Sequence, residues 1–569
     1  MECGLRRRLA GVSRFLDQLT DSATRSQHGM TSGEPATPLR RTWPQVHATA
    51  RRMAAELLAG GLAPRTPVGI LAAEPVSIAP ASQAVWLTGG SVTMLHQPTP
   101  RTDLAVWAAD TVRVLEMIGA GVVLLGPPFD PLADVLRDEG IAVRMLADLD
   151  TGTALDTRLP VDVGEDDLAL LQLTSGSTAE PKAVKITHGN LFANISAMAE
   201  AADLRAGADV QVSWLPLFHD MGFVGFLTAP AVLGLELVKV TPVDFLSRPL
   251  LWAELISKYG GTVTAAPNFA YAVLARQLAR AEEGSLDLSS MRFALSGAEP
   301  IDPAVVEAFT NAGARFGLRK QAAVGAYGMA ETVLGVSFGP RDVGLEVDTV
   351  DAQELEANRR AVPVPADPDS SDVRRFPLLG PPLRGIEARV VDDDGNVRGE
   401  REVGVLQLRG EAVTAGYLTV DGPVATQDEQ GWLDTGDEGY LAEGAVVVCG
   451  RRKDVIIMGG RNVYPTDIER AAVEVDGVRA GNAVAVRLPD GAGAGGRRES
   501  FAVVVESRQA GDETAEQLIR KDVTARVMSA VGVRPAEVVV LPAGTLPKTP
   551  SGKLRRAATA ELFGGRLSR

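Results

Sequence analysis

Residues 171–182 combine hydroxyl, glycine and lysine side chains in a spacing that could bind phosphate. They read Leu-Gln-Leu-Thr-Ser-Gly-Ser-Thr-Ala-Glu-Pro-Lys. Small residues let backbone N–H groups approach a phosphate chain, while the hydroxyls and the lysine add donors and a positive charge. The stretch is not a Walker A loop, which requires Gly-Lys directly before Ser or Thr. A Ser- and Thr-rich turn between a strand and a helix is the structural alternative.

Three further loops follow apolar segments and carry side chains suited to a nucleotide. They span residues 262–268, 294–300 and 324–332. In open α/β sheets, ligands bind beyond the carboxyl ends of the strands. Tyr327 offers a ring face to a purine, Glu331 an oxygen ligand to Mg²⁺, and Thr332 a hydroxyl to a phosphate. Each loop taken singly is also compatible with an ordinary turn between a strand and a helix.

A histidine and an aspartate stand together at His219 and Asp220, after an apolar run. The pair could place a polar group at the mouth of an apolar pocket, although such a pair is more often structural. Residues 223–233, which follow, are uncharged and rich in small side chains. This composition fits the wall of a tunnel and equally a buried helix.

The elements that must position these residues alternate between helices and short apolar strands. The phosphate-binding candidate follows a strand at 167–173 and precedes a helix at about 190–202. Such alternation predicts an α/β fold with parallel sheets covered by helices. The other predicted elements in this part are a helix at 42–58, strands at 68–72 and 122–125, and a hairpin system that includes 386–391 and 405–408.

A second, smaller α/β domain is predicted beyond residue 450, on a short charged hinge. Its predicted elements are helices at 466–475 and 515–530 and strands at 483–487, 501–506 and 538–541. Gly491, Gly493 and Gly496 satisfy Gly-x-Gly-x-x-Gly, but a strand and not a helix follows, so we interpret them as a hairpin loop. Before the hinge, the pattern loosens over residues 338–377, which indicates an insertion.

Composition limits the classes of function. Among 569 residues, 57 basic against 72 acidic side chains give a net charge of −15, which argues against a nucleic-acid partner. Two cysteines and five scattered histidines predict neither a disulfide framework nor a metal cluster. No apolar run is long enough for a membrane span, and residues 1–30 lack the apolar region of a secretion signal. We therefore expect a cytoplasmic protein.

Taken together, the motifs resemble those of the adenylate-forming superfamily, which includes acyl-CoA synthetases, luciferases and adenylation domains of peptide synthetases. The resemblance covers most of the chain from Thr42. Ala179 and Ala183 depart from it, since glycine is usual at both positions. The motifs occur in the expected order at residues 174–182, 219–222, 327–332, 432–437, 450–454 and 547–553.

Within the superfamily, the chain looks most like the fatty acyl-AMP ligases. Residues 216–222, 266–271 and 296–300 carry this likeness, and the stretch between Thr332 and Gly380 leaves room for that group's insertion. The resemblance implies a large N-terminal domain of helix-covered sheets with a β-barrel-like subdomain, and a small mobile C-terminal domain. The expected boundaries are a lead-in at 1–40, the ATP- and fatty-acid-binding domain at 41–449 with its insertion at 338–377, the hinge at 450–454, and the catalytic lid at 455–569.

The resemblance also implies roles for individual residues. Lys553 would bridge the acyl carboxylate and the α-phosphate, His219 would stand near that carboxylate, and Glu331 would bind Mg²⁺. Thr332 and Ala330 would line the α-phosphate, and Lys453 would be the hinge pivot. ATP or AMP would contact Thr174, Ser175, Gly176, Ser177, Thr178, Lys182, Ala298, Glu299, Ala326, Tyr327, Gly328, Ala330, Asp437 and Arg451.

The implied activity is ATP- and Mg²⁺-dependent formation of a fatty acyl-AMP. The acyl group would then pass to the phosphopantetheine thiol of an acyl carrier protein or of a carrier domain in a polyketide or peptide synthase. A carrier serine motif is not found in the sequence, so the acceptor would be a separate chain. The alternatives are an acyl-CoA synthetase of the same fold, an amino-acid-activating domain, and a catalytically inactive binding protein. Acyl chain length and the identity of the carrier are left open.

Overall fold

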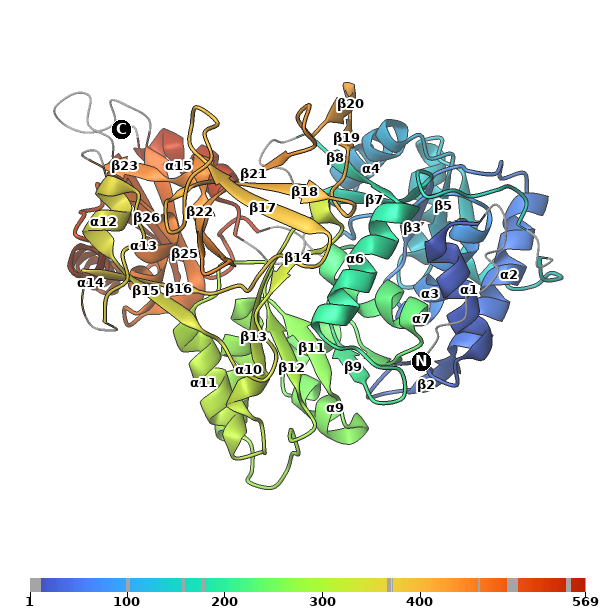
Figure 1. The fold of residues 1–569 in the computed structure, drawn as a ribbon, viewed down its shortest axis with the longest axis horizontal. Coiled ribbons are helices and arrows are strands. Elements are labelled where there is room, and N and C mark those ends of the chain that lie inside the picture. Colours follow the sequence, from blue (N-terminus) through green and yellow to red (C-terminus); the bar gives the residue numbers. More distant parts are fainter. Residues whose placement is uncertain are drawn as a thin grey trace.

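The computed structural model of the chain (Figure 1) describes residues 12–98, 103–155, 159–174, 180–365, 370, 372–458, 461–488, 500–548 and 554–567. Within these residues, two eight-stranded sheets and a four-stranded sheet form the large N-terminal part, and a three-stranded sheet forms the core of the smaller C-terminal part. Helices cover the two large sheets. The chain is a mixed α/β protein, as the alternation of segments predicted.

The first large sheet carries most of the candidate nucleotide loops. Its strand order is β14-β13-β12-β11-β9-β10-β1-β2, and its neighbouring strands are parallel except at the two edges. The carboxyl ends of β11, β12 and β13 therefore meet at one edge of the sheet. The strands are β1 (Gly29–Ser32), β2 (Leu39–Thr42), β9 (Val210–Ser213), β10 (Glu236–Lys239), β11 (Val263–Ala266), β12 (Phe293–Ser296), β13 (Ala323–Gly328) and β14 (Gly335–Phe338).

The second large sheet carries the phosphate-loop candidate. Its order is β20-β19-β8-β7-β4-β3-β5-β6. The predicted strand at 167–173 is β7, which runs parallel to β4 and antiparallel to β8. The strands are β3 (Val68–Leu71), β4 (Val92–Met94), β5 (Val122–Leu125), β6 (Val143–Met145), β7 (Leu168–Thr174), β8 (Lys182–Thr187), β19 (Gly416–Thr419) and β20 (Gly422–Ala425).

Most helices of the large part share one extensive hydrophobic core with the two sheets, while α4 and α5 pack in a second hydrophobic cluster against the second large sheet. Over the described residues, none of the helices combines the length and the apolar character that a membrane-spanning segment needs. The helices are α1 (Arg14–Arg25), α2 (Trp43–Ala59), α3 (Pro75–Leu87), α4 (Leu104–Ile118), α5 (Ala133–Asp138), α6 (His188–Ala201), α7 (Ala229–Leu233), α8 (Pro242–Ser247), α9 (Leu251–Tyr259), α10 (Asn268–Arg280) and α11 (Pro303–Ala314).

Residues 12–42 belong to this core, although the sequence analysis assigned most of them to a lead-in. Phe15 and Leu16 of α1 are fully buried, and the side-chain oxygen of Ser13 caps the helix by accepting from the N–H of Leu16. Strand β1 pairs with β10, about 200 residues away in the sequence, and so joins the first large sheet. The lead-in thus contains elements that complete the large part.

Figure 1 shows the third sheet between the two large sheets and the C-terminal part, and the helix α12 of the insertion beside the C-terminal part. The subdomain expected to be barrel-like contains, among the described strands, an antiparallel sheet of order β17-β18-β21-β22. The insertion folds as a two-stranded sheet with one short helix. These elements are β15 (Val347–Asp351), α12 (Ala352–Asn358), β16 (Val373–Pro377), β17 (Ile386–Val391), β18 (Gly404–Gly410), β21 (Leu433–Ala442) and β22 (Ala445–Arg451).

The C-terminal part has a hydrophobic core of its own, built by its sheet and two helices. Gly491, Gly493 and Gly496 lie outside the described residues, between the antiparallel strands β25 and β26. The elements are β23 (Ile456–Met458), β24 (Arg461–Val463), α13 (Pro465–Val473), β25 (Val478–Leu488), β26 (Ser500–Ser507), α14 (Glu513–Val531), β27 (Glu537–Pro542) and α15 (Arg556–Leu567).

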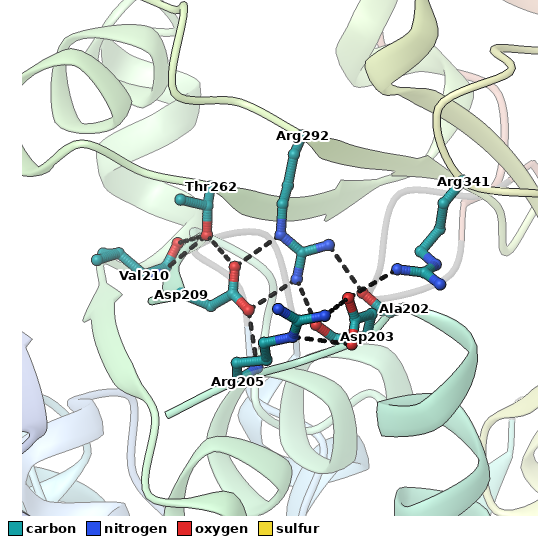
Figure 2. A network of polar contacts seen from close by, with 8 residues as sticks. All are labelled: Ala202, Asp203, Arg205, Asp209, Val210, Thr262, Arg292 and Arg341. Atoms are coloured by element: carbon teal, nitrogen blue, oxygen red, sulfur yellow. Dashed lines mark hydrogen bonds and ion pairs between the residues drawn. The ribbon is translucent and has the colours of Figure 1, made fainter. Parts of the chain in front are cut away.

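A polar network ties together the starts of β9, β11 and β12, at the sheet edge opposite the nucleotide loops (Figure 2). Asp209 is 3% exposed, and its two oxygens accept from Nε and Nη2 of Arg292, each at 2.7 Å. The Thr262 hydroxyl donates to the same carboxylate at 2.8 Å. Buried charge is stable only when it is paired and hydrogen-bonded in this way. The network fixes the relative positions of β9, β11 and β12 at their amino-terminal ends. The loops that carry the candidate site residues follow the opposite, carboxyl ends of these strands.

Candidate active site

A cavity of about 2010 Å³ lies where the two large sheets, the third sheet and the C-terminal part meet. It brings together the described site residues that the sequence analysis named, with the exception of Thr332. A cavity this large has room for a nucleotide together with a second substrate. The predicted residues that line it are Thr174, Lys182, His219, Ala298, Glu299, Ala326, Tyr327, Gly328, Ala330, Glu331, Asp437, Arg451 and Lys453.

Asp437, on β21, is held between an aromatic and a basic side chain. The Tyr327 hydroxyl donates to its Oδ2 at 2.5 Å, and Nε of Arg451 lies 2.7 Å from its Oδ1. Burial raises the pKa of Asp437, although Arg451 and Tyr327 both oppose that rise. Burial and the neighbouring Asp437 likewise raise the pKa of Tyr327. A fixed carboxylate beside a tyrosine ring is suited to bind the hydroxyls and the base of a nucleoside.

Glu331 follows β13 and faces a lysine and a second tyrosine. Its Oε1 accepts from the Tyr417 hydroxyl at 2.6 Å, and Nζ of Lys182 lies 3.8 Å from the same oxygen. Nζ of Lys182 also lies 4.0 Å from the centre of the Tyr417 ring, as in a cation–π contact. Burial lowers the pKa of Lys182, and the positive charges of Arg451 and Lys453 add to that effect, while Glu331 opposes it. Sequence reasoning missed Tyr417, because it lies far from every motif.

The phosphate-loop candidate closes a β-hairpin and is not a turn from a strand into a helix. Thr174, the last residue of β7, pairs with Lys182, the first residue of β8. Ser175, Gly176, Ser177, Thr178 and also Ala179 lie outside the described residues. The hairpin places Lys182 at the cavity wall, and α6 begins only after β8 has ended. The sequence pattern did not indicate β8.

The loop after β12 has an unusual backbone at the cavity. Ala298 adopts φ of +67°, in the left-handed region that residues with a Cβ rarely enter. The neighbouring Glu299 accepts from the backbone N–H of Phe269 through Oε1 at 2.7 Å, which ties this loop to the start of α10. Non-glycine residues in this region concentrate at functional sites, where the surrounding structure maintains the strain.

His219 and Asp220 contact each other and line the cavity, so the pair has the structural contact expected of it, and its role toward a substrate stays a prediction. Nδ1 of His219 lies 2.6 Å from Oδ1 of Asp220, which also accepts from the N–H of Met221. Gly222 is required here, because a Cβ would lie 2.0 Å from the carbonyl oxygen of Pro216. The uncharged segment that follows is a π-helix, η3 (Met221–Thr228), continued by α7.

Thr332 is the described site residue that does not line the cavity. It is fully buried, and its hydroxyl donates to the carbonyl of Met329 at 3.0 Å. The next residue, Val333, has φ of +71°. In this structure Thr332 therefore fixes the turn that carries Glu331, and its hydroxyl does not point at the cavity wall.

The hinge region and the C-terminal part close one side of the cavity. Lys453 lies in a short 3₁₀-helix, η6 (Arg452–Asp454), and Asp454 accepts from Nη1 of Arg556 at 2.9 Å. Nη2 of Arg470 in α13 donates to the carbonyl of Ile301 at 2.8 Å, which joins the C-terminal part to the loop after Ala298. Lys548 lines the cavity and donates to Oδ1 of Asn482 at 2.7 Å. Lys553 lies outside the described residues.

One carboxylate at the cavity is placed to bind a divalent cation. Among the described residues, Oε2 of Glu331 receives no hydrogen bond from another side chain, while Oε1 is already occupied by Tyr417. The described residues contain no group of three or more His, Cys, Asp or Glu side chains arranged to hold a metal ion by themselves. A single carboxylate fits Mg²⁺ when the nucleotide phosphates and water supply the remaining ligands.

Comparisons with known proteins agree with this geometry. The model of the AMP-binding enzyme family matches residues 30–418. A putative ligase of Mycobacterium tuberculosis (strain ATCC 25618 / H37Rv), Rv1013, is 56% identical over 553 residues, which are 97% of this chain and 100% of that protein. The medium-chain-fatty-acid–acyl-carrier-protein ligase JamA of Moorena producens (strain JHB) is 34% identical over 418 residues, 71% of this chain and 69% of that protein.

A solved structure is also similar to this chain over nearly its whole length. The chain is similar to one solved in structural and functional studies of fatty acyl-adenylate ligases from E. coli and L. pneumophila. The TM-score is 0.86 at 30% sequence identity, with 97% of each chain covered.

Proposed function

Because the chain belongs to the AMP-binding enzyme family, we propose that it activates a medium- or long-chain fatty acid with ATP, forming an acyl-AMP and pyrophosphate. The acyl group then passes to the phosphopantetheine thiol of a separate acyl carrier protein or of a synthase carrier domain. The relatives support both steps, since JamA is named a fatty-acid–carrier-protein ligase and the similar solved chain a fatty acyl-adenylate ligase.

The observation that carries this proposal is that one cavity is lined both by ionic side chains and by apolar side chains. One wall holds the ionic groups Lys182, Glu331 and Asp437, and another is built from apolar side chains such as Met198, Phe226 and Phe293. The ionic wall suits a nucleotide with its triphosphate, and the apolar wall suits an acyl chain. Both substrates can then reach the same reaction centre.

The reaction needs positive charge, because a carboxylate is a poor nucleophile toward an anionic phosphate. In-line attack on the α-phosphate shifts charge onto the leaving pyrophosphate, where fixed cations stabilise it. We assign this role to Lys182, with residues 174–178 as hydrogen-bond donors. Asp437 and Arg451 hold the ribose, Tyr327 and Ala298 frame the adenine, and His219 stands at the acyl carboxylate.

Mg²⁺, when bound at Glu331, supplies further charge neutralisation on the phosphates. Tyr417 holds one oxygen of Glu331 and leaves the other for the cation. Lys553 bridges the acyl carboxylate and the α-phosphate in this proposal, which rests on the resemblance of residues 547–553 to the family's lysine motif. Two oriented partners also lower the entropic part of the barrier.

The proposed domain roles follow from where the elements lie. Residues 41–449 bind ATP and the fatty acid, residues 450–454 act as the hinge with Lys453 as its pivot, and residues 455–569 form the catalytic lid. Thiol transfer needs another entrance than adenylation, so the lid must move between the two steps. We also propose a cytoplasmic location, because ATP is a substrate and Cys449 is a free cysteine.

The insertion at 338–377 favours a carrier protein over coenzyme A as the acceptor. Its buried Glu356 accepts from Nη2 of Arg374 at 2.6 Å and from Nε of Arg461, on the lid, at 3.0 Å. Arg374 in turn lies 3.5 Å from Asp467 of α13. The insertion therefore holds the lid by ion pairs, and we propose that this restraint disfavours the rearrangement that coenzyme A would need.

The test is to measure pyrophosphate, acyl-AMP, acyl-CoA and acyl-carrier products with purified protein across fatty acids of increasing length. We expect pyrophosphate release that requires a fatty acid and Mg²⁺, with little acyl-CoA when coenzyme A is added. Efficient acyl-CoA synthesis would overturn the choice of acceptor. Full adenylation by Lys553→Ala would overturn the role of that lysine.

A further inference from the structure

Two buried polar side chains line the cavity, and the mechanism above uses neither of them. Gln211 on β9 is 2% exposed and Lys239 on β10 is fully buried, yet both line the cavity. Apolar residues that line the same cavity include Met198, Phe226 and Val263. Polar groups buried in such surroundings are costly unless hydrogen bonds compensate them.

Strand pairing places these side chains on the same face of the first large sheet. Ser213 is opposite Lys239 and Gln211 is opposite Leu237 in the parallel ladder of β9 and β10. Partners in register point to the same side, and so do residues two apart in one strand. Gln211 is also opposite Val263 of β11, another cavity residue. The π-helix η3 packs against β9 and β10 and contributes Phe226 to the cavity.

Counting only described residues, Lys239 has two hydrogen-bond partners, which leaves one bonding position of Nζ unfilled. Nζ donates to Oγ of Ser213 at 3.1 Å and to the carbonyl of Leu215. Among the described residues, no carboxylate forms an ion pair with it. Burial lowers its pKa well below the usual lysine value. As an ammonium it would have a third N–H to donate, and as a neutral amine it would have a lone pair to accept with.

The hydrogen bonding of the Gln211 side chain is also incomplete. Its buried Oε1 has no hydrogen-bond partner within the part of the chain that the structure describes. The O and N atoms of an amide are assigned from the bonds they make, so this position is an unfilled acceptor or, with the amide rotated, an unfilled donor. Unsatisfied buried polar groups are uncommon in native proteins and call for an explanation.

We propose that Gln211 and Lys239 form a subsite for a hydroxyl group on the acyl chain, so that the enzyme prefers hydroxylated fatty acids. A hydroxyl both donates and accepts, and it can therefore complete either state of Lys239 and either orientation of Gln211. A plain alkyl chain completes neither. A second carboxylate only accepts, so it can complete only the ammonium form of Lys239 and the donor orientation of Gln211. The inference rests on the proposed adenylation of fatty acids.

The experiment measures kcat/KM for acyl-AMP formation with three kinds of acid. These are dodecanoic acid, dodecanoic acids hydroxylated at successive carbons, and dodecanedioic acid. We expect one hydroxylated position to exceed dodecanoic acid by about tenfold or more, because sites built to bond a hydroxyl discriminate against the analogue that lacks it. Equal values for all positions, or the highest value for dodecanedioic acid, would overturn the subsite.

The variants Lys239→Met and Gln211→Leu should each lower the ratio of hydroxylated to plain substrate toward one, while dodecanoic acid continues to react. Leu237→Met on the same strand is the control, since Leu237 is buried but does not line the cavity. An unchanged ratio in both variants would contradict the proposal. Failure of every acid to release pyrophosphate would instead refute the proposed function, so the two outcomes are distinguishable.

Discussion

The Tyr417 hydroxyl donates to Oε1 of Glu331 at 2.6 Å, although the two residues are 86 positions apart in the sequence. Tyr417 comes from β19, which lies between β20 and β8 in the second large sheet, whereas Glu331 follows β13 of the first. The bond therefore joins the two sheets at the proposed metal ligand. It fixes one carboxylate oxygen of Glu331, and in the proposed function the other oxygen binds the cation.

Tyr417→Phe should lower the affinity of the enzyme for Mg²⁺. Without the hydroxyl, Glu331 is free to pair more closely with Lys182, which lies 3.8 Å away. Residues that orient a metal ligand typically contribute about 10- to 100-fold to metal affinity or activity. Pyrophosphate release measured against Mg²⁺ concentration should show a raised half-saturation point. Tyr259→Phe, which removes a hydroxyl bound to Glu34, should leave that point unchanged. Wild-type Mg²⁺ dependence in Tyr417→Phe would contradict the role of Tyr417.

Asp437→Asn should raise the KM for ATP by about tenfold or more, since a hydrogen bond to a charged acceptor contributes about 1.5–3 kcal/mol. The substitution keeps the shape of the side chain but removes the charge that Arg451 and Tyr327 hold in place. A ground-state contact should affect KM more than kcat. Asp434→Asn is the control, because Asp434 pairs with Arg452 outside the cavity. A fall in kcat alone would argue against a ribose contact.

Glu356→Gln should let coenzyme A act as an acceptor. The change removes the charge that joins Arg374 of the insertion to Arg461 of the lid. With the lid less restrained, acyl-CoA formation should rise while adenylation is retained. Glu354→Gln, on the same helix but bonded to Asn358, serves as the control. If acyl-CoA does not increase in Glu356→Gln, the ion pairs are not what determines the acceptor.

The network at the starts of β9, β11 and β12 should matter for stability and not for chemistry. Arg292→Met leaves the buried Asp209 carboxylate without its partner, which costs about 3 kcal/mol in comparable cases. Arg205→Met removes an arginine that is largely exposed, and should cost much less, because solvent screens an exposed ion pair. Urea denaturation of the two variants provides the comparison. Equal losses would contradict the importance of burial at this network.

Acid should destabilise the large part through His188, which is fully buried against Phe15 of α1. Burial lowers the pKa of His188 from 6.5 to about 4, although the charges of Asp167 and Glu165 oppose the shift. The unfolded chain binds a proton near pH 6.5 and the folded chain only near pH 4, so the free energy of unfolding falls as the pH drops across that interval. The total loss is about 3 kcal/mol.

The measurement is the unfolding midpoint of wild type and His188→Asn across that pH interval. Because His188→Asn carries no titrating group at this position, the stability difference between the two proteins should narrow as the pH falls. A constant difference would show that His188 does not titrate as its burial implies.

The sequence predicted site residues well where they belong to short motifs of consecutive residues. Glu331, Asp437 and Lys182 stand in short motifs whose order pointed to one family, and the structure places all three at one cavity. Periodicity likewise predicted β5 and most of the C-terminal elements, because apolar alternation is a local signal.

What could not be predicted depends on contacts between distant segments. Tyr417, Gln211 and Lys239 have no motif, and their positions follow only from strand pairing. Strand β8 was missed because its residues, taken alone, resemble a loop that leads to a helix. They form a strand by pairing with β7 and β19, which the sequence pattern does not indicate. The buried character of α1 was missed because a short amphipathic helix is stabilised mainly by tertiary packing.

One buried cluster includes Val350 and Phe376 of the insertion, Tyr440 of the third sheet, and Val455 and Tyr464 of the lid. Any movement that separates Val455 and Tyr464 from the other members transfers apolar surface to water. Exposure of apolar surface carries a positive heat-capacity change. The free energy of lid movement in this enzyme should therefore depend on temperature along a curve and not a straight line. The balance between adenylation and thiol transfer should then change with temperature as well.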